Sequence, residues 1–184
     1  IRGYTLIEQV IGIIVFSIAL GLFMSLIVPQ AILSVGLVFQ VRASELGQSL
    51  INEIASKSFD EESDRTGGAI LCTGSSCTAW DNLGADTMEM EKETETRSNF
   101  DDVDDYNGFE MPDDNGKFSN ALGNTLSING ADLYSGFKVR VSVFYDANFD
   151  GLNDEEISSA KLITVTITTP NNEDITFSTY VSNY

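Results

Sequence analysis

Residues 146–157 carry the side chains whose types and spacing best suit a chemical role. Oxygen ligands recur at every second position, and a glycine stands sixth, as in the first nine positions of an EF-hand-type calcium loop. The predicted ligands are the side chains of Asp146, Asn148, Asp150 and Asp154 and the main-chain carbonyl of Leu152. The twelfth position, where a true EF-hand has a bidentate glutamate, is Ile157. The alternative is an acidic hairpin turn without an ion. Three carboxylates packed this closely repel one another, so the pattern favours Ca²⁺.

A second acidic run lies between Phe100 and Tyr106. Its four aspartates are Asp101, Asp102, Asp104 and Asp105. Runs of acidic residues are usually solvated faces, and that is the first interpretation here. The alternative is a second cation, or help in closing the first site.

The only two cysteines, Cys72 and Cys77, lie close together in a Gly/Ser-containing turn. In an oxidising compartment this spacing predicts a local disulfide. Two free thiols or half of a metal site are the alternatives. A structural zinc would lack its other ligands, because the chain has no histidine and no further cysteine.

The overall composition disfavours an enzyme and a nucleic-acid partner. Acidic residues number 28 and basic residues 10, a net charge of -18, whereas phosphate binding needs clustered Lys and Arg. The absence of histidine removes the commonest general base, and there is no recognisable nucleophile motif. We therefore expect a non-enzymatic protein with an acidic, extracellular type of surface.

A long apolar helix must precede these sites. Residues 9–41 contain no Asp, Glu, Lys or Arg. This run of 33 residues is longer than the roughly 20 apolar residues that span a bilayer. Arg2 predicts that the N-terminal end is cytoplasmic. Gly21 and Pro29 predict a kink or local melting between them. From Arg42 the pattern becomes amphipathic without a break, and its apolar face consists of Leu46, Leu50, Ile51 and Ile54.

The rest of the chain predicts a head in two parts. Residues 69–125 are expected to be largely irregular, and residues 126–184 to form an antiparallel sheet. Strict alternation over 134–145, 160–169 and 175–181 predicts half-buried strands. Their core-facing residues are Phe137, Val139, Val141 and Val143, then Ile163, Val165 and Ile167, then Ile175, Phe177 and Val181. The sheet needs a cover, and the apolar face of residues 42–57 supplies it.

The N-terminus carries a family resemblance. Its residues Gly3-Tyr4-Thr5-Leu6-Ile7-Glu8, followed by the uncharged segment, resemble the class III signal of type IV prepilins, with Tyr4 where phenylalanine is usual. The resemblance implies cleavage after Gly3 by a prepilin peptidase, N-methylation of Tyr4, and pairing of Glu8 with the α-amino group of a neighbouring subunit. It also implies the α+β pilin fold: residues 1–3 a leader remnant, 4–58 a spine helix with 4–41 in membrane or filament, and 59–184 a head.

Residues 42–54 and 100–108 are similar to segments of minor pilins from mannose-sensitive haemagglutinin pili. The implied partners are other copies or other pilins in a helical filament, the pilus assembly machinery, and the bacterial inner membrane before export to an extracellular filament. A tip-associated adhesive pilin and a type II secretion pseudopilin share this N-terminus and stay open. So does a plain membrane anchor, although an anchor gains nothing from Glu8.

Overall fold

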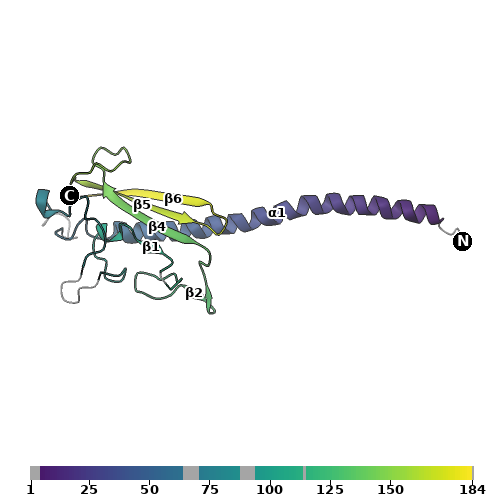
Figure 1. The fold of residues 1–184 in the computed structure, drawn as a ribbon, viewed down its shortest axis with the longest axis horizontal. Coiled ribbons are helices and arrows are strands. Elements are labelled where there is room, and N and C mark those ends of the chain that lie inside the picture. The colour runs from purple at the N-terminus through teal and green to yellow at the C-terminus, as the bar shows by residue number, and fades with distance from the viewer. Residues whose placement is uncertain (1–4, 64–70, 88–93, 114, 184) are drawn as a thin grey trace. The chain divides into compact units, whose positions relative to one another are not determined.

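The computed structural model describes residues 5–63, 71–87, 94–113 and 115–183, in two units, Ile1–Val41 and Arg42–Tyr184. Helix α1 (Leu6–Ala55) belongs to both units (Figure 1). The Oγ1 of Thr5 accepts a hydrogen bond from the Glu8 amide at 3.4 Å, which caps the first turn. Of the kink or local melting predicted between Gly21 and Pro29, the prediction of local melting is wrong, because α1 remains helical through both residues. A proline removes only one backbone hydrogen bond, and the neighbouring turns keep theirs.

The second unit contains a four-stranded antiparallel sheet in the order β1-β4-β5-β6. Its strands are β1 (Glu110–Met111), β4 (Lys138–Tyr145), β5 (Ala160–Thr168) and β6 (Asp174–Ser182). A separate ribbon pairs β2 (Ser127–Ile128) with β3 (Ala131–Asp132). The predicted combination of an N-terminal apolar helix with an antiparallel sheet, an α+β architecture, is therefore confirmed. Strand β1 lies in the stretch that we expected to be irregular.

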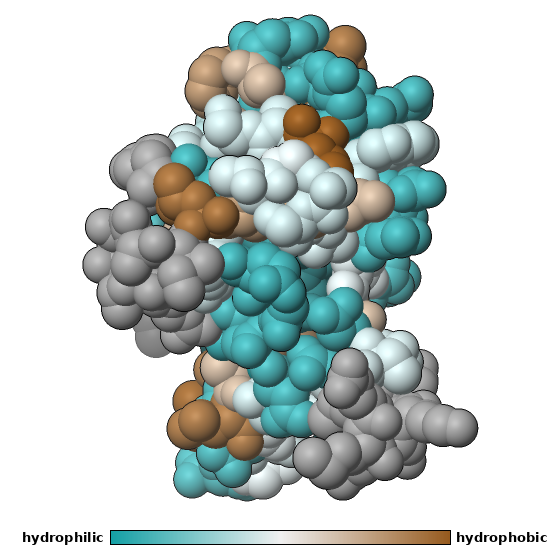
Figure 2. Space-filling view, turned by 90° about the vertical axis from the view of Figure 1, so that its left-hand side faces the viewer, coloured by the Kyte–Doolittle hydropathy of each residue, from teal (hydrophilic) through white to brown (hydrophobic). Residues whose placement is uncertain are grey.

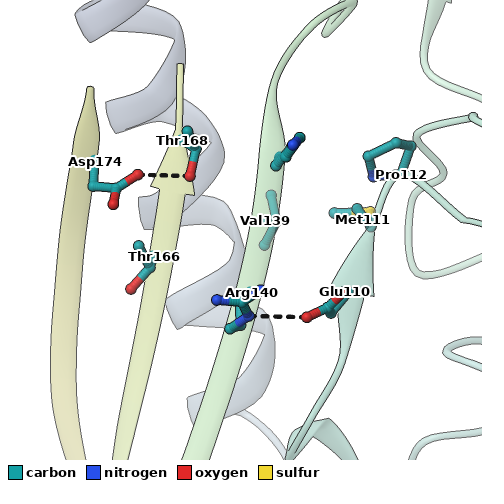
Figure 3. A pocket seen from close by; sticks show the side chains of 9 residues that line it. Glu110, Met111, Pro112, Val139, Arg140, Thr166, Thr168 and Asp174 are labelled. Carbon is teal, nitrogen blue, oxygen red and sulfur yellow. Dashed lines mark hydrogen bonds and ion pairs between the residues drawn. The ribbon is translucent and has the colours of Figure 1, made fainter. Parts of the chain in front are cut away.

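The core of this unit lies between the sheet and the part of α1 from Arg42 onward, which runs behind the strands in Figure 3. The predicted apolar helix face is buried, as are the alternating residues of β4 and β5: Leu46, Leu50, Ile51, Ile54, Val139, Val141, Val143, Ile163, Val165 and Ile167. Helix and sheet approach closely at Gly47, where a Cβ would lie 2.4 Å from the Phe177 ring. Glycine at this position therefore permits the close packing.

The irregular part of the head is fastened to the end of α1. Arg97 forms a two-pronged ion pair with Glu53, at 2.9 and 2.6 Å, and the Tyr106 hydroxyl donates to the same carboxylate at 2.8 Å. Two short 3₁₀ helices, η1 (Gly74–Ser76) and η2 (Asp104–Tyr106), lie in this part. A parallel bridge between Ser58 and Asp102 brings the second acidic run beside the residues that follow α1.

Candidate functional site

The first turns of α1 form an apolar surface that the described residues leave uncovered. The segment Leu6–Ile27, 22 residues, is long and apolar enough to cross a membrane, and every residue in it is exposed. Its length of about 33 Å matches the roughly 30 Å of a bilayer core. Apolar surface of this extent is unfavourable in water, and lipid or packing against other apolar surface would remove it from water.

Glu8 is the only charged residue in this segment, and it lies in the first helical turn. A carboxylate here interacts favourably with the helix dipole, which gives Glu8 a local role in the helix. Gly3 and Tyr4, the predicted cleavage and methylation positions, lie outside the described residues.

The predicted calcium loop connects β4 to β5 and is folded by its own side chains. Asp146 is buried and accepts hydrogen bonds from the Asp150 amide at 3.1 Å, the Gly151 amide at 2.8 Å and the Tyr180 hydroxyl at 2.6 Å. Asn148 Oδ1 accepts from the Asp150 amide at 2.8 Å. Each side chain thus holds the turn that follows it, and Gly151, with φ of 81°, makes the sharp bend.

The ends of the loop are tied in the same way. Asp150 Oδ1 accepts from the Leu152 amide at 2.9 Å, and Asp154 Oδ2 accepts from the Ala147 amide at 2.7 Å. Burial opposes ionisation of Asp146, but the hydrogen bonds from Tyr180, Gly151 and Asp150 together outweigh it and lower the pKa of this carboxyl. Asp146 is therefore ionised at neutral pH, the form that a cation requires.

The aspartates of the loop do not converge on one point. Among the described residues, one group of three His, Cys, Asp or Glu side chains has its ligand atoms all within 4.8 Å, and it is Asp60, Cys72 and Cys77. In the loop, Asn148 Nδ2 donates to Asp154 Oδ1 at 3.3 Å. A cation bound by both residues would have to replace this hydrogen bond.

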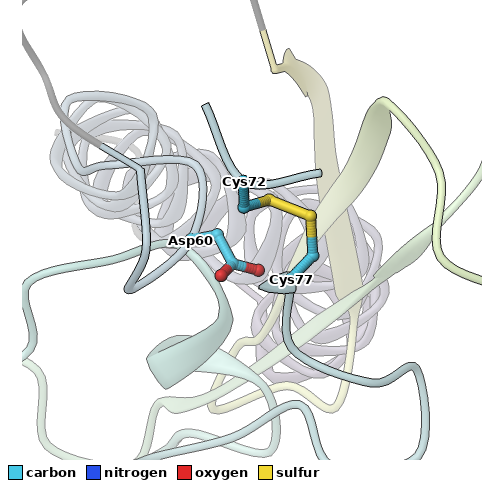
Figure 4. A group of neighbouring side chains, drawn as sticks. All are labelled: Asp60, Cys72 and Cys77. Carbon is cyan, nitrogen blue, oxygen red and sulfur yellow. A yellow bond between two sulfur atoms is a disulfide. The ribbon is translucent and has the colours of Figure 1, made fainter. Parts of the chain in front are cut away.

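The group around Asp60 is not a metal site, because its sulfurs are already bonded. Cys72 and Cys77 form the predicted disulfide, with an S–S distance of 2.08 Å (Figure 4). Sulfur in a disulfide has no thiolate to offer a metal. The Asp60 carboxylate instead accepts a hydrogen bond from the Thr78 amide at 2.9 Å, which ties the disulfide turn to the segment that follows α1.

The fully buried side chain of Lys161 contacts two aspartates. Lys161 Nζ lies 2.5 Å from Asp104 Oδ1 and 3.1 Å from Asp60 Oδ2, and it donates to the Phe59 carbonyl at 2.7 Å. The Phe59 and Tyr145 ring centroids lie 4.5 and 5.1 Å from the same nitrogen. We refer to Lys161, Asp60 and Asp104 as the lysine cluster. All three residues are buried.

The first interpretation of the 101–105 run, a solvated face, is wrong for most of it. Asp102, Asp104 and Asp105 are buried, and Asp101 alone is exposed. Asp105 Oδ2 accepts from the amides of Asp101 and Asp102, so the run folds on itself. Burial, and then the charges of Asp104 and Asp105, raise the pKa of the Asp102 carboxyl to about 9. Of the buried aspartates, Asp104 contacts the buried Lys161, whereas Asp102 and Asp105 accept hydrogen bonds from amides of the run itself.

Sequence reasoning missed Lys161, although one signal for it was present. Lys161 has the same parity along β5 as Ile163, Val165 and Ile167, which all face the core. Strict alternation thus points this lysine inward. A charge on the buried side of a strand requires a partner of opposite charge.

The solvent face of the sheet carries a shallow cavity of about 330 Å³ beside β1 (Figure 3). Among its lining residues, Arg140 Nε donates to Glu110 at 2.9 Å and Thr168 donates to Asp174 at 2.6 Å, and Lys138 also lines it. The Arg140–Glu110 pair is well exposed to solvent, so water screens it and it contributes little to stability. Figure 2 shows another face, where hydrophilic side chains predominate and strongly hydrophobic ones lie apart.

Comparisons of the chain with models of protein families, with curated proteins and with solved structures find no match. The functional interpretation therefore depends on the chain's own residues and geometry.

Proposed function

We propose that this chain is a type IV pilin-like subunit, with a pilin fold, held in the bacterial inner membrane by α1 and later assembled into an extracellular filament through the same helix. One observation carries the proposal. The exposed apolar segment Leu6–Ile27 belongs to the same unbroken helix as the turns after Arg42, whose apolar face is buried. The apolar segment is therefore available for lipid first and for neighbouring subunits afterwards.

Glu8 would favour the transfer of α1 from the membrane into the filament. A carboxylate at the end of a membrane-spanning helix is costly in lipid. In a filament it would pair with the α-amino group of a neighbouring Tyr4, freed by a prepilin peptidase cutting after Gly3 and then N-methylated. Once such a pair is buried, removing one partner costs about 3–5 kcal/mol. Glu8 would thus favour assembly and fix the register between subunits.

The test is to produce the full chain together with a pilus assembly machinery and to image the surface filaments at side-chain resolution. We expect density for this chain, with Glu8 close to a neighbour's N-terminus. Glu8→Gln is expected to insert into the membrane normally, because glutamine also suits the third helical position, but to form few or no filaments. Ile14→Ala, a mild apolar change in the same segment, is the control and should assemble.

Filaments that form equally well with Glu8→Gln would contradict the assembly role. A wild-type chain that stays in the membrane would contradict the subunit role altogether. If this chain appears only at filament ends, it is a minor, tip-associated pilin. If it forms only short periplasmic assemblies, it is a pseudopilin of type II secretion.

We also propose that the head binds Ca²⁺ through Asp146, Asn148, Asp150, Asp154 and the Leu152 carbonyl. The support is the all-oxygen donor set that calcium prefers, and the hydrogen bonds that keep Asp146 ionised. Binding would draw the loop's carboxylates together and remove their mutual repulsion.

A further inference from the structure

We propose that Lys161 and Asp104 join through a spontaneous amide bond between their side chains, with Asp60 carrying the proton. The inference is independent of the pilin proposal, because all three residues lie in the head, and it concerns a covalent modification of the chain itself. It starts from a combination that is rarely stable as free charges: an ammonium group and two carboxylates, all removed from water.

The distances place the reacting atoms close together. Lys161 Nζ lies 2.5 Å from Asp104 Oδ1. Because a carbon–oxygen bond is about 1.2 Å long, Nζ lies no further than about 3.7 Å from the carbon it must attack. Reacting atoms in productive arrangements are about 3–3.5 Å apart, and fixed proximity of this kind is worth a very high effective concentration.

The reacting groups are enclosed by aromatic rings and closed off from water. The Phe59 and Tyr145 rings lie beside Nζ, and the side chains of Lys161 and Asp60 have no exposed surface. A site closed to water holds the amine and the carboxyl group in a fixed arrangement. It also excludes the water that would hydrolyse the product.

Asp60 and Asp104 have different partners, which assigns their roles. Asp60 Oδ2 accepts a hydrogen bond from the Thr78 amide at 2.9 Å and lies 3.1 Å from Lys161 Nζ, so the amide fixes this carboxylate beside the amine. Such a fixed carboxylate is suited to accept and return a proton. Asp104 Oδ1 lies 2.5 Å from Lys161 Nζ, closer than Asp60 Oδ2 at 3.1 Å, so Asp104 is the acid to be converted.

The reaction balances without an oxidant or cofactor. Asp60 takes one proton from the Lys161 ammonium and passes it to Asp104, leaving a neutral amine and a neutral carboxylic acid. The amine nitrogen then attacks Cγ of Asp104, and a C–N bond forms. A second proton moves from the nitrogen through Asp60 to the departing hydroxyl, the C–O bond breaks, and one water leaves. Asp60 ends as a carboxylate, and two opposite buried charges have become one neutral amide.

The test is mass spectrometry of the full chain purified in detergent. After proteolysis, we expect a branched peptide pair joining Lys161 to Asp104, lighter than the sum of its parts by one water molecule. Reading the linked pair rather than the intact chain avoids mass changes from N-terminal processing. Unlinked peptides containing Lys161 and Asp104, recovered in full from folded protein, would overturn the proposal. A link from Lys161 to Asp60 would overturn the assignment of the two aspartates.

Variants test the role of each of the three residues. Lys161→Met and Asp104→Ala should lose the linked pair, whereas Lys138→Met, on the solvent face of β4, should keep it. Asp60→Asn still accepts the Thr78 hydrogen bond but cannot carry a proton, so we expect at least a tenfold lower yield of the linked pair. An unchanged yield in Asp60→Asn would overturn the role of Asp60. If a variant does not fold, the wild-type peptide pair alone decides whether the bond exists.

Discussion

The apolar segment Leu6–Ile27 exposes its energetically costly groups, whereas the second unit, Arg42–Tyr184, which comprises the head and the last turns of α1, buries them. The segment exposes apolar side chains and holds a single charge, Glu8, in its first turn. The head buries charges, above all Lys161 with its two aspartates. The first arrangement leaves apolar surface uncovered, whereas in the second the buried charges have partners within the head. Substitutions in the segment should therefore affect assembly, and substitutions in the head should affect stability.

The largest contrast is expected from the same substitution made in each part of α1. Ile54 is 0% exposed and Ile14 is 54% exposed. Ile54→Ala should lower the free energy of unfolding of the head by about 2–5 kcal/mol, because it leaves a cavity in the core. Ile14→Ala should leave the head unchanged. The measurement is urea unfolding of the full chain in detergent, followed by the fluorescence of Trp80, the only tryptophan. Equal losses in the two variants would remove the distinction between the two regions.

The second contrast concerns pH and the buried acids of the head. The pKa of Asp102 is raised from 3.8 to about 9, chiefly by burial, so the folded head holds a proton that the unfolded chain releases. Between these values the folded state binds more protons, and rising pH therefore favours unfolding. This contribution to stability is complete below about pH 4 and is lost as pH rises toward 9.

Asp102→Asn mimics the protonated acid and still accepts the Asp105 amide. Its stability relative to wild type should rise by up to about 1.4 kcal/mol per pH unit across this range. Unfolding curves at several pH values measure the difference. Asp81→Asn, at an exposed position, is the control and should run parallel to wild type. A constant difference between Asp102→Asn and wild type would show that Asp102 is ionised in the folded head.

The sequence predicted the parts of the structure that local periodicity determines. The buried face of α1 after Arg42 and the alternation of β4 and β5 follow from side-chain spacings of 3.6 and 2 residues. The two-residue strand β1 could not be predicted, because it is too short to show any period. It exists because Glu110 and Met111 pair with Arg140 and Val139, about 30 residues later in the chain.

The two acidic regions show the same limit at the level of the sites. In the 146–154 loop each side chain bonds to amides a few residues away, so spacing alone predicts the turns. The lysine cluster instead joins residues 57 and 101 positions apart. The parity of Lys161 along β5 indicates a buried charge, but the identity of its partners depends on how the irregular segment after α1 packs. Periodicity carries no information about that packing.

A smaller effect is expected from Ca²⁺. If the loop binds with the affinity of extracellular calcium sites, about 10⁻⁴ M, then about 1 mM Ca²⁺ should stabilise the head by roughly 1.4 kcal/mol. Thermal unfolding with calcium and with chelator measures this. Asp150→Asn should abolish the difference, and Asp81→Asn should keep it. A wild-type head indifferent to both calcium and chelator would exclude a calcium site in the loop.

The smallest predicted effect compares two glycines of the same helix. A Cβ on Gly47 would lie 2.4 Å from the Phe177 ring, whereas a Cβ on Gly21 would have no atom within 4 Å among the described residues. Alanine gains about 1 kcal/mol of helix propensity at either position, but at Gly47 the ring must move, and overpacking costs about 1–3 kcal/mol. Gly47→Ala should therefore destabilise the head by on the order of 1 kcal/mol, and Gly21→Ala should not change it. If Gly47→Ala instead stabilises the head, the ring yields without cost, and glycine is not needed for the close approach of α1 to the sheet.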